Sequence, residues 1–432
     1  MQIQDSVGRN SPPPASSAGL GSRLAARALG IYGRMIEPVA RVRQYVGIAA
    51  GSLGLTGARA LAGPLHAQVG ICDPCNHECV FCWDHPPKER QTDSERFGYA
   101  RQGVMPLERF KSVVDDVYKA GTRRIDIVGR GEPLLNPAVL DMVSYAKQQK
   151  MLVLLCSNAS RLATKTAEGL VDAGLDRLNV SLNAGKPESY PDNHVTETPE
   201  NYIKVKSNLR YLADYKARLG SAVPHMRLSF VISTKNYFEL EQMVRVTAEV
   251  GAQEAMFTHT VVNERTQDLA LSQEQYQELL ASGPAASAAA TELGIDTNVK
   301  TLAATIPSYL EDTIVGPRVV PCYAGYYFTF VLANGSVLPC CQCSKSIGRI
   351  TEDQSFADVW ASDEYRTFRR AAKKLPEPDE ALSECECDRC MLRPRNISIH
   401  NFLHPTNPID GGDKDQLFSV SDLLRMKKSH RR

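Results

Sequence analysis

The sequence lacks the features of a membrane or secreted protein. None of its apolar runs approaches the ~20 residues that a membrane-spanning helix needs. No segment combines a charged start, an apolar core and a cleavage site, which is the arrangement of a secretory signal. The sequence therefore predicts a protein with no membrane span, and we expect it in the cytoplasm.

The sequence also has almost no net charge. Its 50 Lys and Arg residues balance 49 Asp and Glu residues, which leaves a formal charge of +1. A general basic surface for nucleic acid is therefore excluded, and so is an acidic one. The polar segment 405–432 ends in basic residues and is expected to be a solvated tail.

Cysteine is nearly absent from the middle of the chain, where Cys156 is the only one between residues 83 and 321. All the others fall within 72–82 and 322–390. In a chain of 432 residues these close spacings are more typical of metal binding than of a disulfide framework, and they favour a reducing environment. Cys156 ends an apolar run, so we expect a structural role for it.

The order of the predicted helices and strands indicates an α/β fold. Between residues 66 and 271, short β-type runs alternate with amphipathic runs, such as the helix Leu107–Lys119 and the strands Arg124–Val128 and Glu254–His259. About six βα units are visible, which predicts a parallel sheet covered by helices and too few units for a closed eight-stranded barrel. The carboxyl ends of such strands share one edge, where function collects.

Other segments flank this core. We expect a disordered N-terminus over 1–22, a helical extension over 23–65, a helical connector over 272–317 and a small α+β domain over 318–404. In the small domain, Asn334-Gly335 separates two β-type runs and predicts a hairpin.

Three cysteines follow the first predicted strand, His66–Ile71, in the spacing CxxxCxxC. These are Cys75, Cys79 and Cys82. Three thiolates on one loop can hold three irons of a [4Fe–4S] cube, whereas structural clusters usually have four cysteine ligands. The fourth iron would be open to a small molecule, as in catalytic metal sites. The alternative is a zinc site completed by His77, His85 or Cys72.

Polar residues follow the later strands of the predicted sheet. Glu132 lies in the turn Gly129–Pro133 after the second strand, Asn158 follows the third, and Ser181 and Asn183 end the fourth. Each alone is typical of an ordinary turn or helix cap. Together they would line one rim, as a polar ligand beside a metal requires.

In these motifs the chain resembles the radical S-adenosylmethionine (radical SAM) superfamily over residues 66–260. The resemblance implies a partial (βα)6 barrel whose loop cysteines bind a [4Fe–4S] cluster. The amino and carboxylate groups of S-adenosylmethionine would chelate the open iron, and reductive cleavage would yield a 5′-deoxyadenosyl radical that abstracts hydrogen. The resemblance also implies cofactor contacts from Phe81, Gly131, Glu132, Pro133, Asn158, Ser181, Asn183 and Val231.

Three positions lie outside the family pattern. Arg130 stands where the family turn usually has glycine, and Ala159 stands where the third-strand motif often has glycine. Neither change removes a ligand. Cys72 is outside the cysteine triad, and we expect it to be a buried thiol.

A second cysteine group resembles the SPASM/twitch extensions that follow many radical SAM barrels. Cys322 is followed by twelve residues, Gly335, four residues and Cys340, and far downstream comes Cys387-x-x-Cys390. The resemblance implies one auxiliary [4Fe–4S] cluster on these four cysteines, which could accept the electron left after hydrogen abstraction. Alternative ligands are Cys341, Cys343 and Cys385. A zinc ribbon is the competing prediction.

We therefore predict a radical SAM enzyme that oxidises or epimerises a small-molecule or carbohydrate-like substrate, with a reductant such as flavodoxin or ferredoxin. SPASM/twitch relatives also modify peptides, so a peptide-modifying maturase is one alternative. A non-catalytic iron–sulfur scaffold or electron carrier is the alternative of another class. The sequence identifies no catalytic residue, and the candidates for substrate contact or hydrogen return are His85, Arg130, His259 and Cys343. The loop 186–198 is a candidate lid over the site.

Overall fold

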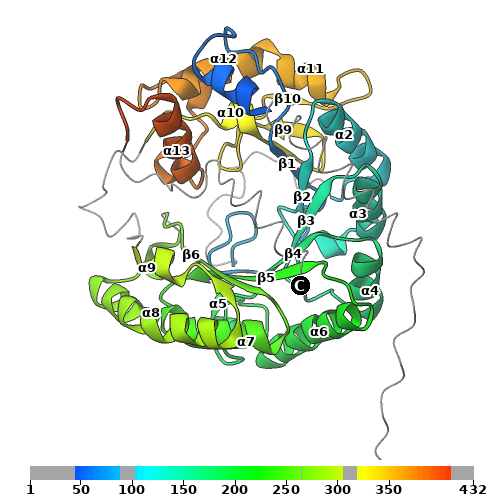
Figure 1. Cartoon of the computed structure of the whole chain (residues 1–432), viewed down its shortest axis with the longest axis vertical. Coiled ribbons are helices and arrows are strands. Elements are labelled where there is room, and N and C mark those ends of the chain that lie inside the picture. Colours follow the sequence, from blue (N-terminus) through cyan, green and yellow to red (C-terminus); the bar gives the residue numbers. More distant parts are fainter. Residues whose placement is uncertain (1–43, 88–102, 264, 305–318, 410–432) are drawn as a thin grey trace, which may run out of the picture.

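The computed structural model describes residues 44–87, 103–263, 265–304 and 319–409. Their strands form one sheet, and helices flank it (Figure 1). The strands are β1 (His66–Gly70), β2 (Arg124–Val128), β3 (Leu152–Ser157), β4 (Arg177–Ser181), β5 (His225–Ile232), β6 (Glu254–His259), β7 (Asp296–Thr297), β8 (Phe328–Val331), β9 (Ser336–Leu338) and β10 (Gly348–Arg349). The helices are α2 (Leu107–Lys119), α3 (Val139–Gln148), α4 (Thr164–Asp172), α5 (Tyr190–Asn193), α6 (Pro199–Arg218), α7 (Leu240–Glu249), α8 (Gln273–Leu293), α9 (Val299–Ala304), α10 (Ala324–Tyr327), α11 (Phe356–Ala361), α12 (Asp363–Lys373) and α13 (Arg393–Leu403).

The sheet has ten strands in the order β10-β9-β8-β1-β2-β3-β4-β5-β6-β7. The strands from β8 to β7 in this order are parallel, whereas β9 and β10 pair antiparallel. Because β1 to β6 are parallel neighbours, their carboxyl ends lie along one edge. The loop with the first three cysteines leaves β1 at that edge.

The two faces of the sheet differ in polarity. Along β5, Met226, Leu228, Phe230 and Ile232 are buried, and the residues between them are partly exposed. The buried set belongs to one core with apolar residues of the helices, which lie on the outer side of the curved sheet (Figure 1). We call the opposite side the inner face.

Helix α2 shows how the sequence pattern produces this packing. Phe110, Val113, Val114 and Val117 recur at helical spacing and are fully buried. The helix ends before Gly121, whose φ of 106° is in the region that favours glycine.

Most predicted elements are confirmed. The bounds of α2, β2 and β6 agree with the prediction, and β1 to β6 supply the six parallel strands. The connector was predicted to be helical, but it also contains β7, which pairs with β6 through Glu254 and Asp296. A two-residue strand is too short to show a periodic pattern, so the sequence could not reveal it.

The small C-terminal region extends the same sheet. Its predicted hairpin is confirmed as β8 and β9, with Gly335 at φ 86° in the turn. Strand β8 also pairs in parallel with β1, with Thr329 opposite Ala67. Hydrogen bonds of the sheet therefore cross the predicted boundary between the core and the auxiliary domain, and the domain bounds stay a prediction.

Residues 44–52 are helical, whereas residues 53–65 form turns and irregular segments, and the helical extension over 23–65 stays a prediction. The predictions for the disordered N-terminus and for most of the polar tail concern residues outside the described ranges. Within the described ranges, no helix combines the length and apolarity needed to cross a membrane.

Candidate functional site

The cysteine loop is packed against the turn that follows β2. The amide of Gly131 donates to the carbonyl of Cys72 at 3.0 Å, and the amide of Glu132 donates to that of Pro74 at 2.9 Å. A side chain at Gly131 would overlap the Pro74 carbonyl, and one at Gly129 would lie 2.6 Å from the Cys72 carbonyl. These glycines therefore allow the backbone of the cysteine loop to approach the turn closely.

The three loop cysteines form one electrostatic group. Burial, reinforced by the charges of Cys82 and Cys75, raises the pKa of Cys79 well above its usual value. Burial also raises the pKa of Cys75, and that of Cys82 to about 12. Three thiolates held this close repel one another, so a bound cation is needed to keep all three deprotonated. The donor set fits an iron–sulfur cluster with one open iron.

Two histidines lie beside Cys79: His77 on the same loop and His194 from a distant segment. The possible ligand atoms of His77, Cys79 and His194 lie within 4.8 Å of one another, and Cys79 Sγ is 3.1 Å from His194 Nδ1. His194 follows α5, in the loop 186–198 that was predicted to be a lid. Sequence reasoning missed it because it lies 115 residues from Cys79.

The other residues named for a zinc site have different contacts. The ring Nε2 of His85 donates to the Asp73 carbonyl at 2.7 Å, and its backbone amide donates to Cys82 Sγ at 3.2 Å. Cys72 is fully buried, and burial raises the pKa of its thiol to about 12. Its geometry agrees with the predicted buried thiol.

Glu132 is buried at the ends of β2 and β3. Its Oε1 accepts from Ser157 Oγ at 2.7 Å and from the Leu134 amide at 2.9 Å, and its Oε2 accepts from the Asn158 amide at 2.7 Å. Burial raises the pKa of Glu132 against the opposing effect of these donors. The carboxylate therefore fastens the turn to β3, and the expected contact of Glu132 with the cofactor stays a prediction.

The side chain of Asn158 fastens the cysteine loop to β3. Its Nδ2 donates to Asn76 Oδ1 at 3.2 Å, and its Oδ1 accepts from Ser160 Oγ at 2.7 Å. Asn76 Nδ2 in turn donates to Ser160 Oγ at 2.8 Å. Ala159 has a φ of 58°, which explains why glycine suits this position.

Asn183 joins the ends of β4 and β5. Its Oδ1 accepts from the Val231 amide at 2.9 Å, while its Nδ2 is buried without a hydrogen bond to the described residues. Ser181 is opposite Ser229 in the register of the same two strands. Phe81 lies on the cysteine loop, with its ring 6.3 Å from that of His194. These residues share one edge with the cysteines, as a cofactor site requires.

Arg130 pairs with an acidic residue of the cysteine loop, and the ring of His259 lies near an aromatic residue of α8. Arg130 pairs with Asp84 at 2.6 Å and thereby ties the end of the cysteine loop to the turn after β2. His259 ends β6, with its ring 6.3 Å from that of Tyr276 on α8. Their roles toward a substrate stay predictions.

The second cysteine group surrounds a cavity in the C-terminal region. The lining includes all four predicted ligands, with Cys385 and the apolar Phe368 and Leu375. The four are Cys322, Cys340, Cys387 and Cys390. Burial and the charge of Cys390 raise the pKa of Cys322, and burial raises those of Cys387 and Cys390 to about 11. This thiol-lined site fits an auxiliary cluster.

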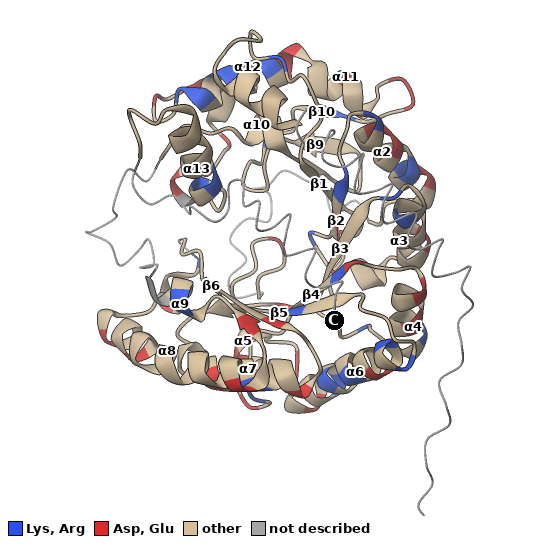
Figure 2. Ribbon diagram, in the orientation of Figure 1, with Lys and Arg blue, Asp and Glu red and all other residues tan. Residues whose placement is uncertain are grey.

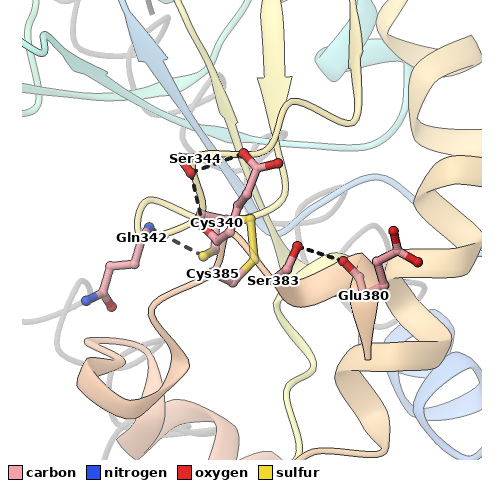
Figure 3. The surroundings of a disulfide bond; sticks show 8 residues. Cys340, Gln342, Ser344, Glu380, Ser383 and Cys385 are labelled. Atoms are coloured by element: carbon pink, nitrogen blue, oxygen red, sulfur yellow. Dashed lines mark hydrogen bonds between the residues drawn. A yellow bond between two sulfur atoms is a disulfide. The ribbon is translucent and has the colours of Figure 1, made fainter. Parts of the chain in front are cut away.

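Two of the alternative ligands are joined to each other. Cys343 and Cys385 form a disulfide beside Cys340 (Figure 3). The bond corrects their assignment as alternative ligands, because a sulfur shared in a disulfide offers no thiolate. It also corrects the prediction that Cys343 returns a hydrogen atom, because the disulfide has no S–H bond. Cys341 stays a free thiol, half-buried near Cys340.

Comparison with known proteins matches both regions. The family model "Radical SAM superfamily" matches residues 71–217, and the SPASM model, "Iron-sulfur cluster-binding domain", matches residues 322–391. Each match contains one of the two cysteine groups, in the predicted order.

Three individual proteins resemble this chain at low sequence identity. The "PqqA peptide cyclase" of Gluconobacter oxydans is 24% identical over 358 residues, which are 80% of this chain and 90% of the relative. The "Tungsten-containing aldehyde ferredoxin oxidoreductase cofactor-modifying protein" of Pyrococcus furiosus is 22% identical over 353 residues, 76% of this chain and 87% of the relative. The structure of Streptococcus suis SuiB bound to precursor peptide SuiA is 14% identical with a TM-score of 0.54, covering 79% of this chain and 74% of that one. The SuiB likeness supports the fold.

Proposed function

The chain is a radical SAM superfamily enzyme with a SPASM domain C-terminal to its radical SAM domain, and we propose that it modifies a peptide at a C–H bond. One observation carries the proposal: similarity to a peptide cyclase extends over 80% of this chain and 90% of that relative. A peptide substrate replaces the small or carbohydrate-like molecule expected from the sequence as the first candidate.

The residues of the site have separable roles in this proposal. Cys75, Cys79 and Cys82 would hold the cluster, and the polar edge near Asn183 and Ser181 would bind S-adenosylmethionine. Together these groups supply one-electron cleavage of the sulfonium and removal of a hydrogen atom from the substrate. The bonds of the cysteine loop to the turn after β2 and to Asn158 hold the three thiols in place before the metal binds.

The C-terminal cavity would hold the auxiliary cluster. Cys322, Cys340, Cys387 and Cys390 supply four ligands, so no iron would be open to substrate. Such a cluster is suited to transfer of the second electron of a net oxidation. A small reductant protein such as flavodoxin or ferredoxin would supply the electron for the first cluster.

The activity can be tested without knowledge of the substrate. The chain is reconstituted anaerobically, reduced with dithionite and supplied with S-adenosylmethionine, and 5′-deoxyadenosine is measured. We expect formation by the wild type, loss in Cys75→Ala, and retention in Cys72→Ala, because Cys72 is a buried thiol outside the triad. A wild type that holds iron but forms no 5′-deoxyadenosine would support the non-catalytic scaffold.

The substrate class is tested by hydrogen transfer. Deuterated peptides and a deuterated pool of small molecules are supplied in separate reactions, and deuterium in 5′-deoxyadenosine is measured by mass spectrometry. Transfer from the peptide pool supports the proposal. Transfer from the small-molecule pool alone supports the second candidate, a cofactor-like substrate, which the likeness to the cofactor-modifying protein favours.

A further inference from the structure

The inner face of the sheet carries charged residues where a barrel usually packs branched apolar side chains. The charged residues of β2, β4, β5 and β6 are Arg124, Asp126, Arg177, Arg227 and Glu254, and Figure 2 shows both signs of charge on this sheet. On β5, Arg227 lies between the buried Met226 and Leu228, so it faces away from the helices. A polar inner face is suited to a ligand more than to a dry core.

Part of this charge is balanced within the protein. Arg124 binds both oxygens of Asp126, with Nε and Nη2 at 2.9 and 3.1 Å. Arg227 Nη2 lies 2.7 Å from Glu254 Oε1, and these residues are opposite each other in the register of β5 and β6. These two pairs account for Asp126 and Glu254, the two carboxylates among these charged residues.

Arg177 is the cation left over. Its Nη1 is 3.8 Å from Glu254 Oε2, beyond hydrogen-bonding distance, and the Arg177 side chain makes no hydrogen bond with the described residues. Arg227 lies close enough to lower the pKa of Arg177, after burial as the main cause. The Nε of Arg227 is itself buried without a hydrogen bond to the described residues.

Arg177, Arg227 and Glu254 together carry one excess positive charge. His225 lies 3.8 Å from Glu254, and burial and Arg177 lower its pKa, so a neutral imidazole is favoured there. An excess charge that is partly removed from water is unfavourable until an anion neutralises it. The side chain of Arg177 is 35% exposed, which leaves it open to such a group.

We propose that Arg177, assisted by Arg227 Nε, binds an oxyanion of the substrate, a carboxylate or a phosphate, on the inner face of the sheet. The planar guanidinium fork of arginine matches such groups with two parallel hydrogen bonds. This inference rests on the proposed function, because it assigns a residue that positions the substrate of the same enzyme.

The position of Arg177 fits this role. It begins β4, and Ser181 ends the same strand at the edge of the cofactor site. Four residues of strand span roughly 13 Å. A substrate held at Arg177 by its anionic group would therefore present another part of its chain to the edge where hydrogen is removed.

Chemical footprinting of the wild-type holoenzyme tests the proposal. Phenylglyoxal, which modifies arginine, is applied in phosphate, in acetate and in chloride at equal ionic strength, and each modified arginine is quantified by peptide mapping. We expect phosphate or acetate to slow modification of Arg177 at least about threefold relative to chloride, as occurs when the anion exceeds twice its dissociation constant. The exposed Arg210 on α6 is the control and should react equally in all three salts.

The three salts also distinguish a phosphate group from a carboxylate as the bound oxyanion. Protection by phosphate alone assigns a phosphorylated group, and protection by acetate as well assigns a carboxylate. Equal modification of Arg177 in all three salts overturns the proposal, as does equal protection of Arg210. Phosphate titrations of three variants provide the second measurement. Phosphate binding should be lost in Arg177→Gln, weakened in Arg177→Lys and unchanged in Arg210→Gln.

A failure of the anion site and a failure of the proposed function would give different results. The wild type that forms 5′-deoxyadenosine but shows no protection at Arg177 would contradict the anion site alone. The absence of 5′-deoxyadenosine would contradict the enzyme activity, whatever the footprint.

Discussion

At the residue scale, the glycines around Glu132 decide where the metal-binding loop lies. Gly131 is in contact with the backbone of Pro74, and backbone cannot move aside as a flexible side chain can. The carboxylate of Glu132 then closes the arrangement by accepting hydrogen bonds from the end of β3. The Gly-x-Gly-Glu-Pro turn thus supports the cysteine loop, in addition to the cofactor contact that is predicted for it.

We predict that Gly131→Ala displaces the cysteine loop. The added methyl group overlaps the Pro74 carbonyl, and overpacking of this kind costs about 1–3 kcal/mol. Iron bound after reconstitution and the urea midpoint should both fall. Gly283→Ala is the matched control: Gly283 lies within α8, and the nearest atom to its new methyl group, Cγ1 of Val299 on α9, is 3.9 Å away. An iron content equal to that of the wild type in Gly131→Ala would contradict the prediction.

His66 is predicted to make the fold sensitive to acid. Its ring lies 5.0 Å from that of Phe328, and burial lowers its pKa from 6.5 to about 3. The unfolded chain therefore binds a proton below pH 6.5 that the folded chain does not, so stability falls as the pH drops from 6.5 toward 3. Between pH 7 and 5.5 the loss is about 1 kcal/mol.

This loss is measured as the change in unfolding free energy from urea denaturation at the two pH values. His66→Leu, which has no titrating group, should show a smaller change than the wild type. An equal change in both proteins would assign the acid sensitivity to other groups.

At the element scale, two segments form the wall of the auxiliary site. Residues 340–344 and 384–390 are joined by the Cys343–Cys385 disulfide and by the Glu386 amide, which donates to the Gln342 carbonyl at 3.1 Å. These bonds hold Cys340 near Cys387 and Cys390 around one cavity. The Cys343–Cys385 disulfide thus connects the two segments that carry three of the proposed cluster ligands.

The proposed ligand set predicts iron contents. Two [4Fe–4S] clusters give ~8 Fe per chain, and Cys340→Ser should reduce this to ~4 because a cluster ligand is lost. Cys343→Ser should keep ~8 Fe, since it removes only the disulfide. Iron and zinc contents measured in the same samples test both the ligand set and the zinc-ribbon alternative. Loss of iron in Cys343→Ser would place that sulfur on the cluster, and bound zinc in place of iron would support a zinc ribbon.

At the scale of the whole molecule, the sheet unites regions that the sequence divided. Strand β8 of the C-terminal region pairs with β1, the strand that leads into the cysteine loop. Helix α11 also contacts the N-terminal half, since the Phe356 amide donates to Asp116 of α2 at 3.0 Å. Each cluster site is therefore built on a strand of the same sheet.

We predict that both regions unfold together. The chain has 2 tryptophans, Trp83 on the cysteine loop and Trp360 on α11. In Trp83→Phe the fluorescence of Trp360 reports on the C-terminal region. In Trp360→Phe the fluorescence of Trp83 reports on the cysteine loop. Their urea midpoints, and that of the far-ultraviolet circular dichroism of each variant, should coincide. Two well-separated midpoints would show that the regions are independent domains.

Local patterns in the sequence were sufficient for much of this protein. Periodicity predicted α2, β2 and β6 because burial of one face imposes it on each element separately. The CxxxCxxC spacing predicted the first metal site, since three ligands on one short loop need no distant partner. The Asn334-Gly335 turn predicted the β8–β9 hairpin for the same reason.

Only the tertiary structure decided which distant residues meet. His194 reaches Cys79, Cys343 is bonded to Cys385, and β8 lies beside β1. None of these contacts has a signature in local spacing, because each depends on how separate elements pack. The excess charge of Arg177 is of the same kind: it follows from the register of β4, β5 and β6, which places two arginines beside one glutamate.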